Sequence, residues 1–207
     1  MTAPGGAAPG AGPSEGTTRR ITDIDTLKAI GHPLRMKLYR ALFVARTATA
    51  SQLADQVDEA VSLVSYHLRK LADHGLIEAA EAQSGDGRER WWQTATRELR
   101  ILSEDFRDEP GKAVARVSVS RLFFEQRADL YRRYMDEEAA WSQEWQTAAI
   151  DSEYLPRFNV TELAALSDEL MTVLKKHDAR ARAAEAAGDT EGRENVAVHV
   201  YGFPFRP

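Results

Sequence analysis

An amphipathic helical segment that ends at a glycine constrains the fold of this chain more than any other feature. Val64, Leu68 and Leu71 share one side of a helix predicted over residues 61–74, and hydroxyl and basic groups occupy the opposite side. Gly75 follows this segment, at the position where glycine commonly ends a helix. We therefore expect a helix that packs along one narrow stripe and presents hydrogen-bonding groups along the other.

The segments around this helix predict a winged helix-turn-helix. Residues 76–80 are apolar enough for a strand, residues 83–87 have turn composition, and residues 90–94 have the aromatic and β-branched content of a returning strand. Three helical patterns precede the helix predicted over residues 61–74, and their predicted ranges are 23–30, 33–45 and 51–57. The expected fold class is mainly α (α+β), with the hairpin as the wing.

The second half of the chain changes character. Residues 112–150 contain neither proline nor glycine, and their aromatic side chains recur at helical spacing, which predicts one long amphipathic helix. We expect this helix to form a dimer contact or to line an effector pocket. The residues concerned are Phe123, Phe124, Leu130, Tyr131, Tyr134, Trp141 and Trp145.

Two further elements are expected after the long helix. A second apolar stripe predicts a helix over residues 161–186, and the alternation in residues 196–201 predicts a strand that can pair with residues 158–160. The expected organisation is a disordered tail at 1–20, a winged helix-turn-helix DNA-binding domain at 21–105 and a helical dimerisation or possible effector region at 106–207.

Charge is distributed unevenly between the two halves. Residues 19–100 hold 13 Lys and Arg against 11 Asp and Glu, whereas residues 101–207 hold 14 against 20. A net charge of −5 is therefore compatible with a mildly basic face on the first half.

Composition excludes several classes of protein. There is no cysteine, which removes disulfides, thiolate nucleophiles and cysteine-ligated metals. No phosphate-binding glycine loop, Gly-x-Ser-x-Gly motif or spaced pair of metal ligands is found, so we expect no enzyme activity and no cofactor. With no secretory signal and no apolar stretch of membrane-spanning length, the expected location is cytoplasmic.

The polar side of the predicted helix 61–74 is the candidate DNA contact. A helix that enters the major groove must carry hydrogen-bonding groups on its exposed side. The hairpin tip and the start of the preceding helix are placed to meet the DNA backbone. The candidate residues are Ser51, Gln52, Ser62, Ser65, Tyr66, Arg69, Lys70, Arg88 and Arg90. His67 lies between the two sides, so it either packs against the wing or contacts phosphate.

The motifs at residues 27–35, 64–71 and 75–78 together resemble the ArsR-type winged helix-turn-helix regulators, and residues 87–92 resemble the wing of a subgroup with a C-terminal extension. The resemblance implies a homodimer that binds a two-fold DNA operator, usually as a repressor released by an effector. Metal sensing by relatives relies on cysteines or on His and carboxylate ligands in the dimer helix. Residues 112–150 contain no histidine, so that property is not carried over.

A second reading of the same fold remains open. A winged helix can also serve as a protein-interaction module without DNA readout, because fold does not determine function. Substituting Arg69 and Lys70 distinguishes the two hypotheses, since only a DNA-reading domain would lose duplex binding.

Overall fold

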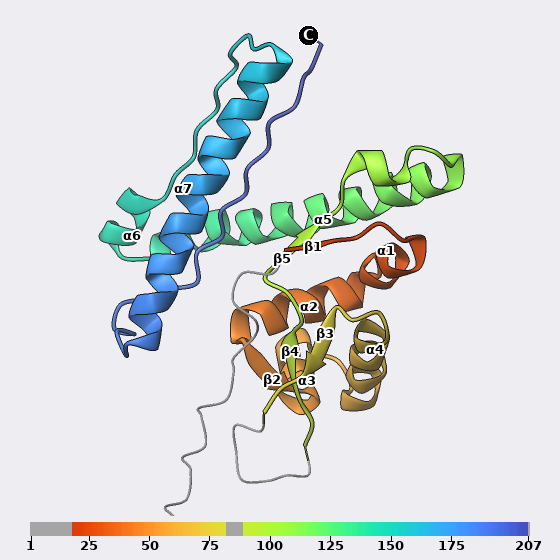
Figure 1. Ribbon diagram of the computed structural model, residues 1–207. Helices are drawn as coiled ribbons and strands as arrows, with labels where there is room; N and C mark the ends of the chain where they lie inside the picture. The colour runs from red at the N-terminus through yellow and green to blue at the C-terminus, as the bar shows by residue number, and fades with distance from the viewer. Residues whose placement is uncertain (1–17, 82–88, 207) are drawn as a thin grey trace, which may run out of the picture. The chain divides into compact units, whose positions relative to one another are not determined.

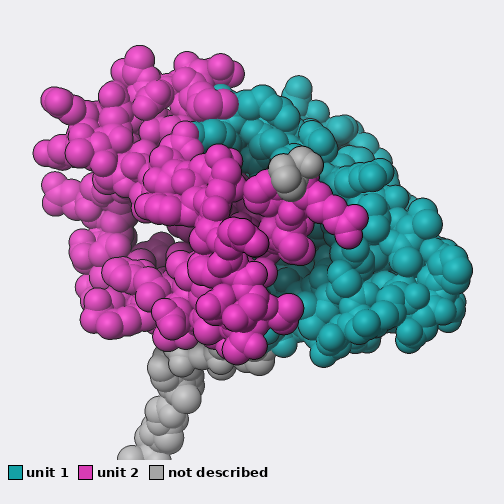
Figure 2. Space-filling model, turned by 90° about the horizontal axis from the view of Figure 1, so that it is seen from above, with its two compact units in different colours: residues 1–132 teal, residues 133–207 magenta. Residues whose placement is uncertain are grey.

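The computed structural model describes residues 18–81 and 89–206 (Figure 1). The chain forms two compact units, residues 1–132 and 133–207 (Figure 2). The fold is mainly helical with small sheets, which confirms the predicted class.

The first unit begins with a short strand and contains the predicted succession of helices and hairpin. In chain order its elements are β1 (Thr18–Arg20), α1 (Ile24–Ile30), α2 (Pro33–Ala45), β2 (Thr47–Thr49), α3 (Ala50–Val57), α4 (Val61–Asp73), β3 (Ile77–Ala79), β4 (Trp91–Thr94), β5 (Glu98–Arg100), the 3-10 helix η1 (Ser103–Phe106) and most of α5 (Pro110–Glu137). Residues 18–20 form β1 and pair in parallel with β5. This corrects the prediction that they belong to a disordered tail.

Local sequence explains where these helices begin. Asp23 caps α1 by accepting the N–H of Thr26, and Pro33 occupies the first turn of α2, where its missing N–H costs nothing. Thr49 and Gln52 form a capping box at α3, in which each side chain accepts the backbone N–H of the other.

The small sheet has the order β2-β4-β3 and is antiparallel throughout. Because β4 is central, Trp92 aligns with Ala48 on one side and Ala79 on the other. We call the β3–β4 hairpin the wing. Residues 82–88, which include its expected turn, lie outside the described residues.

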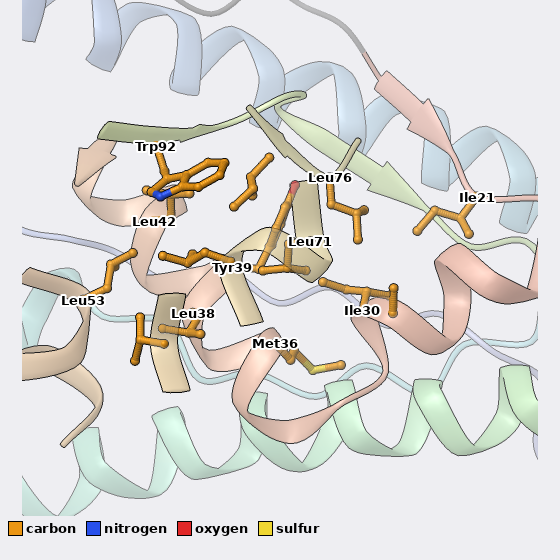
Figure 3. Close-up of a cluster of buried hydrophobic side chains, with 14 of the residues drawn as sticks. Ile21, Ile30, Met36, Leu38, Tyr39, Leu42, Leu53, Leu71, Leu76 and Trp92 are labelled. Carbon is orange, nitrogen blue, oxygen red and sulfur yellow. The ribbon is translucent and has the colours of Figure 1, made fainter. Parts of the chain in front are cut away.

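One hydrophobic core holds the helices and the wing of the first unit together. Figure 3 shows side chains from α2, α3, α4 and the wing converging, and Leu38, Leu53, Leu71 and Trp92 are each at most 4% exposed. This core fixes α4 through its apolar stripe, as the helical spacing predicts.

Helix α5 packs on the turn between α1 and α2. A Cβ built on Gly31 would lie only 2.5 Å from a methyl group of Val119, so the two elements approach as closely as glycine allows. Gln126 adds two polar links, since its backbone carbonyl accepts from Arg40 at 3.0 Å and its side-chain Nε2 donates to the backbone carbonyl of Pro33 at 3.2 Å.

The long helix expected over residues 112–150 is interrupted, which corrects the prediction. Helix α5 ends at Glu137 and is followed by the 3-10 helix η2 (Glu138–Ala140) and by α6 (Gln143–Ala148). The cause is local: Trp141 is extended, and the Ser142 side chain accepts the N–H of Trp145 to start a new helix.

Helix α7 (Val160–Ala186) follows, with a capping box between Asn159 and Glu162. The strand expected at 196–201 does not form, and residues 195–206 have neither helix nor strand. Its expected partner segment is 158–160, but Val160 is helical and Asn159 uses its backbone N–H and carbonyl in bonds to Glu162 and Leu163. These residues are therefore committed to the start of α7 and not to a strand pair. Among the described residues, no helix is both long enough and apolar enough to cross a membrane.

Candidate nucleic-acid interface

The turn between α3 and α4 sets the angle between the two helices. Asp58 adopts a left-handed conformation with φ of 55°, and its backbone N–H bonds to the carbonyl of Ala54. Aspartate adopts the left-handed region more readily than most residues, and this conformation at Asp58 ends α3. Helix α4 then begins at Val61, three residues later.

Helix α4 has two distinct sides. Val64, Leu68 and Leu71 are fully buried. Ser62, Tyr66, Arg69 and Lys70 are exposed on the other side, and Ser65 is half-buried between them. Rigid packing of one side therefore presents the other to solvent, which is the arrangement that major-groove readout requires.

The exposed side carries an aromatic ring beside a cation. Tyr66 is 48% exposed, and the Lys70 ammonium lies 5.9 Å from the centroid of its ring. Lys70 also forms an exposed ion pair with Asp73 at 3.7 Å. Exposed pairs of this kind contribute little to stability, so this one does little to fix the Lys70 side chain.

A shallow cleft lies between the start of α3, the exposed side of α4 and the wing. Its volume is about 340 Å³. It is lined by Thr49, Ala50, Ser51, Val61, Ser65, Arg69, Glu89, Arg90 and Trp92. Four of the residues singled out from the sequence thus meet in one place, and the first N–H groups of α3 have no partner within their own helix.

Glu89 enters this cleft, and no sequence pattern pointed to it. Ser51 donates a hydrogen bond from Oγ to Oε1 of Glu89 at 2.8 Å. The guanidinium of Arg90 lies 4.2 Å from the centroid of the Trp92 ring, which holds it against the wing. The cleft therefore contains two arginines and one carboxylate.

The remaining predicted contact residues are placed less centrally. Gln52 is exposed, and its Oε1 accepts the N–H of Thr49 at 2.9 Å, so its amide group remains on the surface at the start of α3. Ser62, Tyr66 and Lys70 lie on α4 outside the cleft lining. Arg88 lies outside the described residues.

Arg19 contacts the far end of α4, and sequence reasoning missed it because residues 1–20 resembled a featureless tail. Its guanidinium donates to the carbonyl of His74 at 2.8 Å and to that of Gly75. A cation beside the last carbonyls of a helix is favourable because those groups carry partial negative charge. Strand β1 therefore reinforces the end of α4.

His67 packs inside the domain and does not face the wing cleft. It is 5% exposed, its ring lies 4.6 Å from that of His32, and its Nδ1 has no hydrogen-bond partner. Burial lowers the pKa of His67, and the neighbouring His32 and Arg35 lower it further. Burial followed by Arg35 likewise lowers the pKa of His32. Among the described residues, no three His, Asp or Glu side chains gather as a metal-binding group.

The histidine pair predicts a loss of stability in mild acid. Both pKa values fall on folding, so the unfolded chain binds more protons below its histidine pKa of about 6.5. Stability is complete above that pH and declines as the pH falls through the lowered folded values. Urea unfolding at pH 7, 6 and 5 should show this decline, and it should be shallower in His67→Gln.

The exposed His177 on α7 provides the control. His177→Gln should retain the full decline between pH 7 and 5. Equal slopes for His67→Gln and the unmodified chain would show that the buried pair does not set the acid sensitivity.

Comparison with known proteins identifies the segment that carries this geometry. Residues 30–79 match the profile of a helix-turn-helix domain family. Residues 30–79 form a helix-turn-helix domain. The helix-turn-helix predicted from the sequence is confirmed for this segment. A helix-turn-helix domain is typical of DNA-binding regulators of transcription. No curated protein sequence matches the chain.

Two solved structures are similar over a larger part of the chain. One, described as a possible transcriptional regulator for arsenical resistance, is 24% identical over 54% of this chain and 95% of its own, with a TM-score of 0.30. The other is the zinc-responsive MarR family member ZitR of Lactococcus lactis, 16% identical over 67% of this chain and 74% of its own, with a TM-score of 0.28.

Proposed function

We propose that this protein is a homodimeric transcriptional repressor that reads a two-fold DNA operator with the exposed side of α4. The single observation that carries the proposal is the division of α4. Its apolar stripe is fully buried, and Ser62, Tyr66, Arg69 and Lys70 are displayed to solvent. Hydroxyl, phenol, guanidinium and ammonium groups are those that bind base edges and phosphates.

The cleft beside α4 supports the same proposal. The cleft brings together side chains from three different elements, namely Ser51, Ser65, Arg69 and Arg90. The wing and the start of α3 can therefore contact the DNA backbone on either side of the groove that α4 enters. Contacts of this kind position a protein on DNA without reading its sequence. Base readout then belongs to the residues on the exposed side of α4.

The second unit supports dimerisation. No residue among 133–206 is buried, although the segment is rich in large apolar side chains. Phe203 is 70% exposed, and Val173 on α7 is 52% exposed. A unit that buries so little apolar surface cannot offset the entropy of ordering its chain. A second copy of the chain is the partner we propose. A two-fold dimer would cover this apolar surface and would also place its two α4 helices one DNA turn, about 34 Å, apart.

The aromatic residues of α5, of α6 and of the short connection between them have several roles in this proposal. Phe123 packs against the core of the first unit, whereas Phe124 and Tyr131 are 54% and 40% exposed. Trp141 and Trp145 meet edge to face at 6.5 Å. We place the exposed members at the dimer contact, and a small-molecule effector that released the DNA would bind among these aromatic side chains. Leu130 and Tyr134, both half-buried, belong to the same proposed contact.

Fluorescence anisotropy tests the proposal with two labelled duplexes, one from upstream of the gene for this protein and one with the same bases scrambled. The native duplex should bind at least 1,000-fold more tightly if it holds the operator, and affinity should fall steeply with salt. Equal weak binding to both would refute operator readout in that region. Absence of binding at low salt would favour a protein-interaction module instead.

A further inference from the structure

We propose that Glu89 acts as a built-in competitor for DNA phosphate, so that the wing must release Ser51 before the cleft can accept the DNA backbone. This inference rests on the proposed function, and it adds a regulatory role for an acidic residue inside a basic site. The observation behind it is the hydrogen bond from Ser51 Oγ to Glu89 Oε1 at 2.8 Å, inside the cleft that Arg69 and Arg90 also line.

The chemistry of the cleft is that of an anion site. Helix α3 begins there, and the first N–H groups of a helix favour a negative charge. Ser51 supplies a hydroxyl donor, and two guanidinium groups supply positive charge. A carboxylate oxygen and a phosphate oxygen accept the same hydrogen bonds, so Glu89 occupies a place that suits a backbone phosphate.

Competition follows from the position of Glu89. A phosphate that binds Ser51 must break the Ser51–Glu89 hydrogen bond, and it must approach a carboxylate of like charge. Both effects weaken binding to every duplex, whatever its sequence, because phosphate contacts carry no base information. Glu89 therefore lowers non-specific affinity and leaves the base contacts of α4 to decide which sites are occupied.

The test compares Glu89→Gln with Glu78→Gln in the full chain. Glutamine at 89 keeps an oxygen that can accept from Ser51 but removes the charge. Glu78 is a matched control, because it also lies on the wing, is exposed and accepts a side-chain hydrogen bond, from Gln93 at 2.8 Å, yet it does not line the cleft. Both variants change the net charge equally.

Anisotropy with a scrambled duplex at several salt concentrations gives the readout. Glu89→Gln should bind about fivefold more tightly than Glu78→Gln, which matches the effect of one solvent-exposed charge pair. Its logarithmic salt dependence should be steeper by about 0.9, corresponding to one more neutralised phosphate. Ser51→Ala should weaken binding more in the Glu89→Gln background than in the unmodified chain, because a phosphate displaces a neutral amide oxygen from the Ser51 hydroxyl more readily than a charged carboxylate.

The outcomes separate the two proposals. Equal affinities for Glu89→Gln and Glu78→Gln would overturn the role of Glu89 while leaving DNA binding intact. Weaker binding by Glu89→Gln would overturn it as well, and would indicate that Glu89 accepts a hydrogen bond from the DNA. If neither variant nor the unmodified chain binds any duplex at low salt, the proposed function itself fails.

Discussion

Replacing Arg69 and Lys70 together by alanine is expected to weaken operator binding by about 100-fold or more, because each residue contributes a contact worth about 1–3 kcal/mol or a phosphate charge. Both side chains are exposed on α4, next to the stripe that the core holds in place. Their loss removes recognition and backbone charge at the same time. Anisotropy against the operator duplex measures the change, and the salt dependence should become shallower by about 1 for each lost phosphate contact.

A charge-matched variant provides the control for this experiment. Lys175→Ala with Lys176→Ala removes two adjacent exposed cations from α7, outside the helix-turn-helix domain. It should bind the operator within about threefold of the unmodified chain if affinity depends on the position of the charges rather than their number. Equal losses in the two double variants would mean that α4 has no special role. Sedimentation should show the same oligomeric state for both.

Leu68→Ala is expected to cost about 2–5 kcal/mol of stability, the largest effect of any single substitution considered for α4. Leu68 is fully buried against the core of the first unit. Removing its branched end leaves a cavity that close-packed neighbours fill only in part. Against a typical total of about 5–15 kcal/mol, this loss is large enough to lower the urea midpoint substantially.

Leu63→Ala makes the same change five residues earlier on the same helix, where the side chain is 39% exposed. It should cost less than about 1 kcal/mol, because exposed positions leave no cavity. Urea unfolding at one fixed protein concentration compares the two, since dimerisation makes apparent stability depend on concentration. Similar losses at both positions would contradict the assignment of a buried and a displayed side to α4.

The first unit was readable from the sequence because its signals are local. The stripe of Val64, Leu68 and Leu71 determines which side of α4 is buried, and Asp23 and Thr49 cap their helices through contacts three residues away. Gly75 ends the α4 segment with φ of 62°, a conformation that favours glycine. Interactions within a few residues need no knowledge of the rest of the chain.

The structure of the second half was predicted less accurately, because its local sequence pattern is compatible with more than one arrangement of helices and strands. Aromatic spacing in residues 112–150 continues across the break at 138–142, so periodicity alone suggests one helix. The Ser142 cap competes with that pattern and starts a separate helix. The alternation in residues 196–201 likewise predicts a strand, but a strand requires a neighbouring edge that sequence periodicity does not supply.

Sequence by itself determined the helix-turn-helix, its wing and the polar side of α4, because helical period, caps and turn residues act over a few positions. Only the tertiary structure decided the contacts between distant segments. Arg19 at the end of α4, the burial of His67 against His32, and the bond between Ser51 and Glu89 join residues 35–56 positions apart. Such pairs produce no periodic pattern in the sequence, because their geometry is created by the packing of the core and not by local backbone preference.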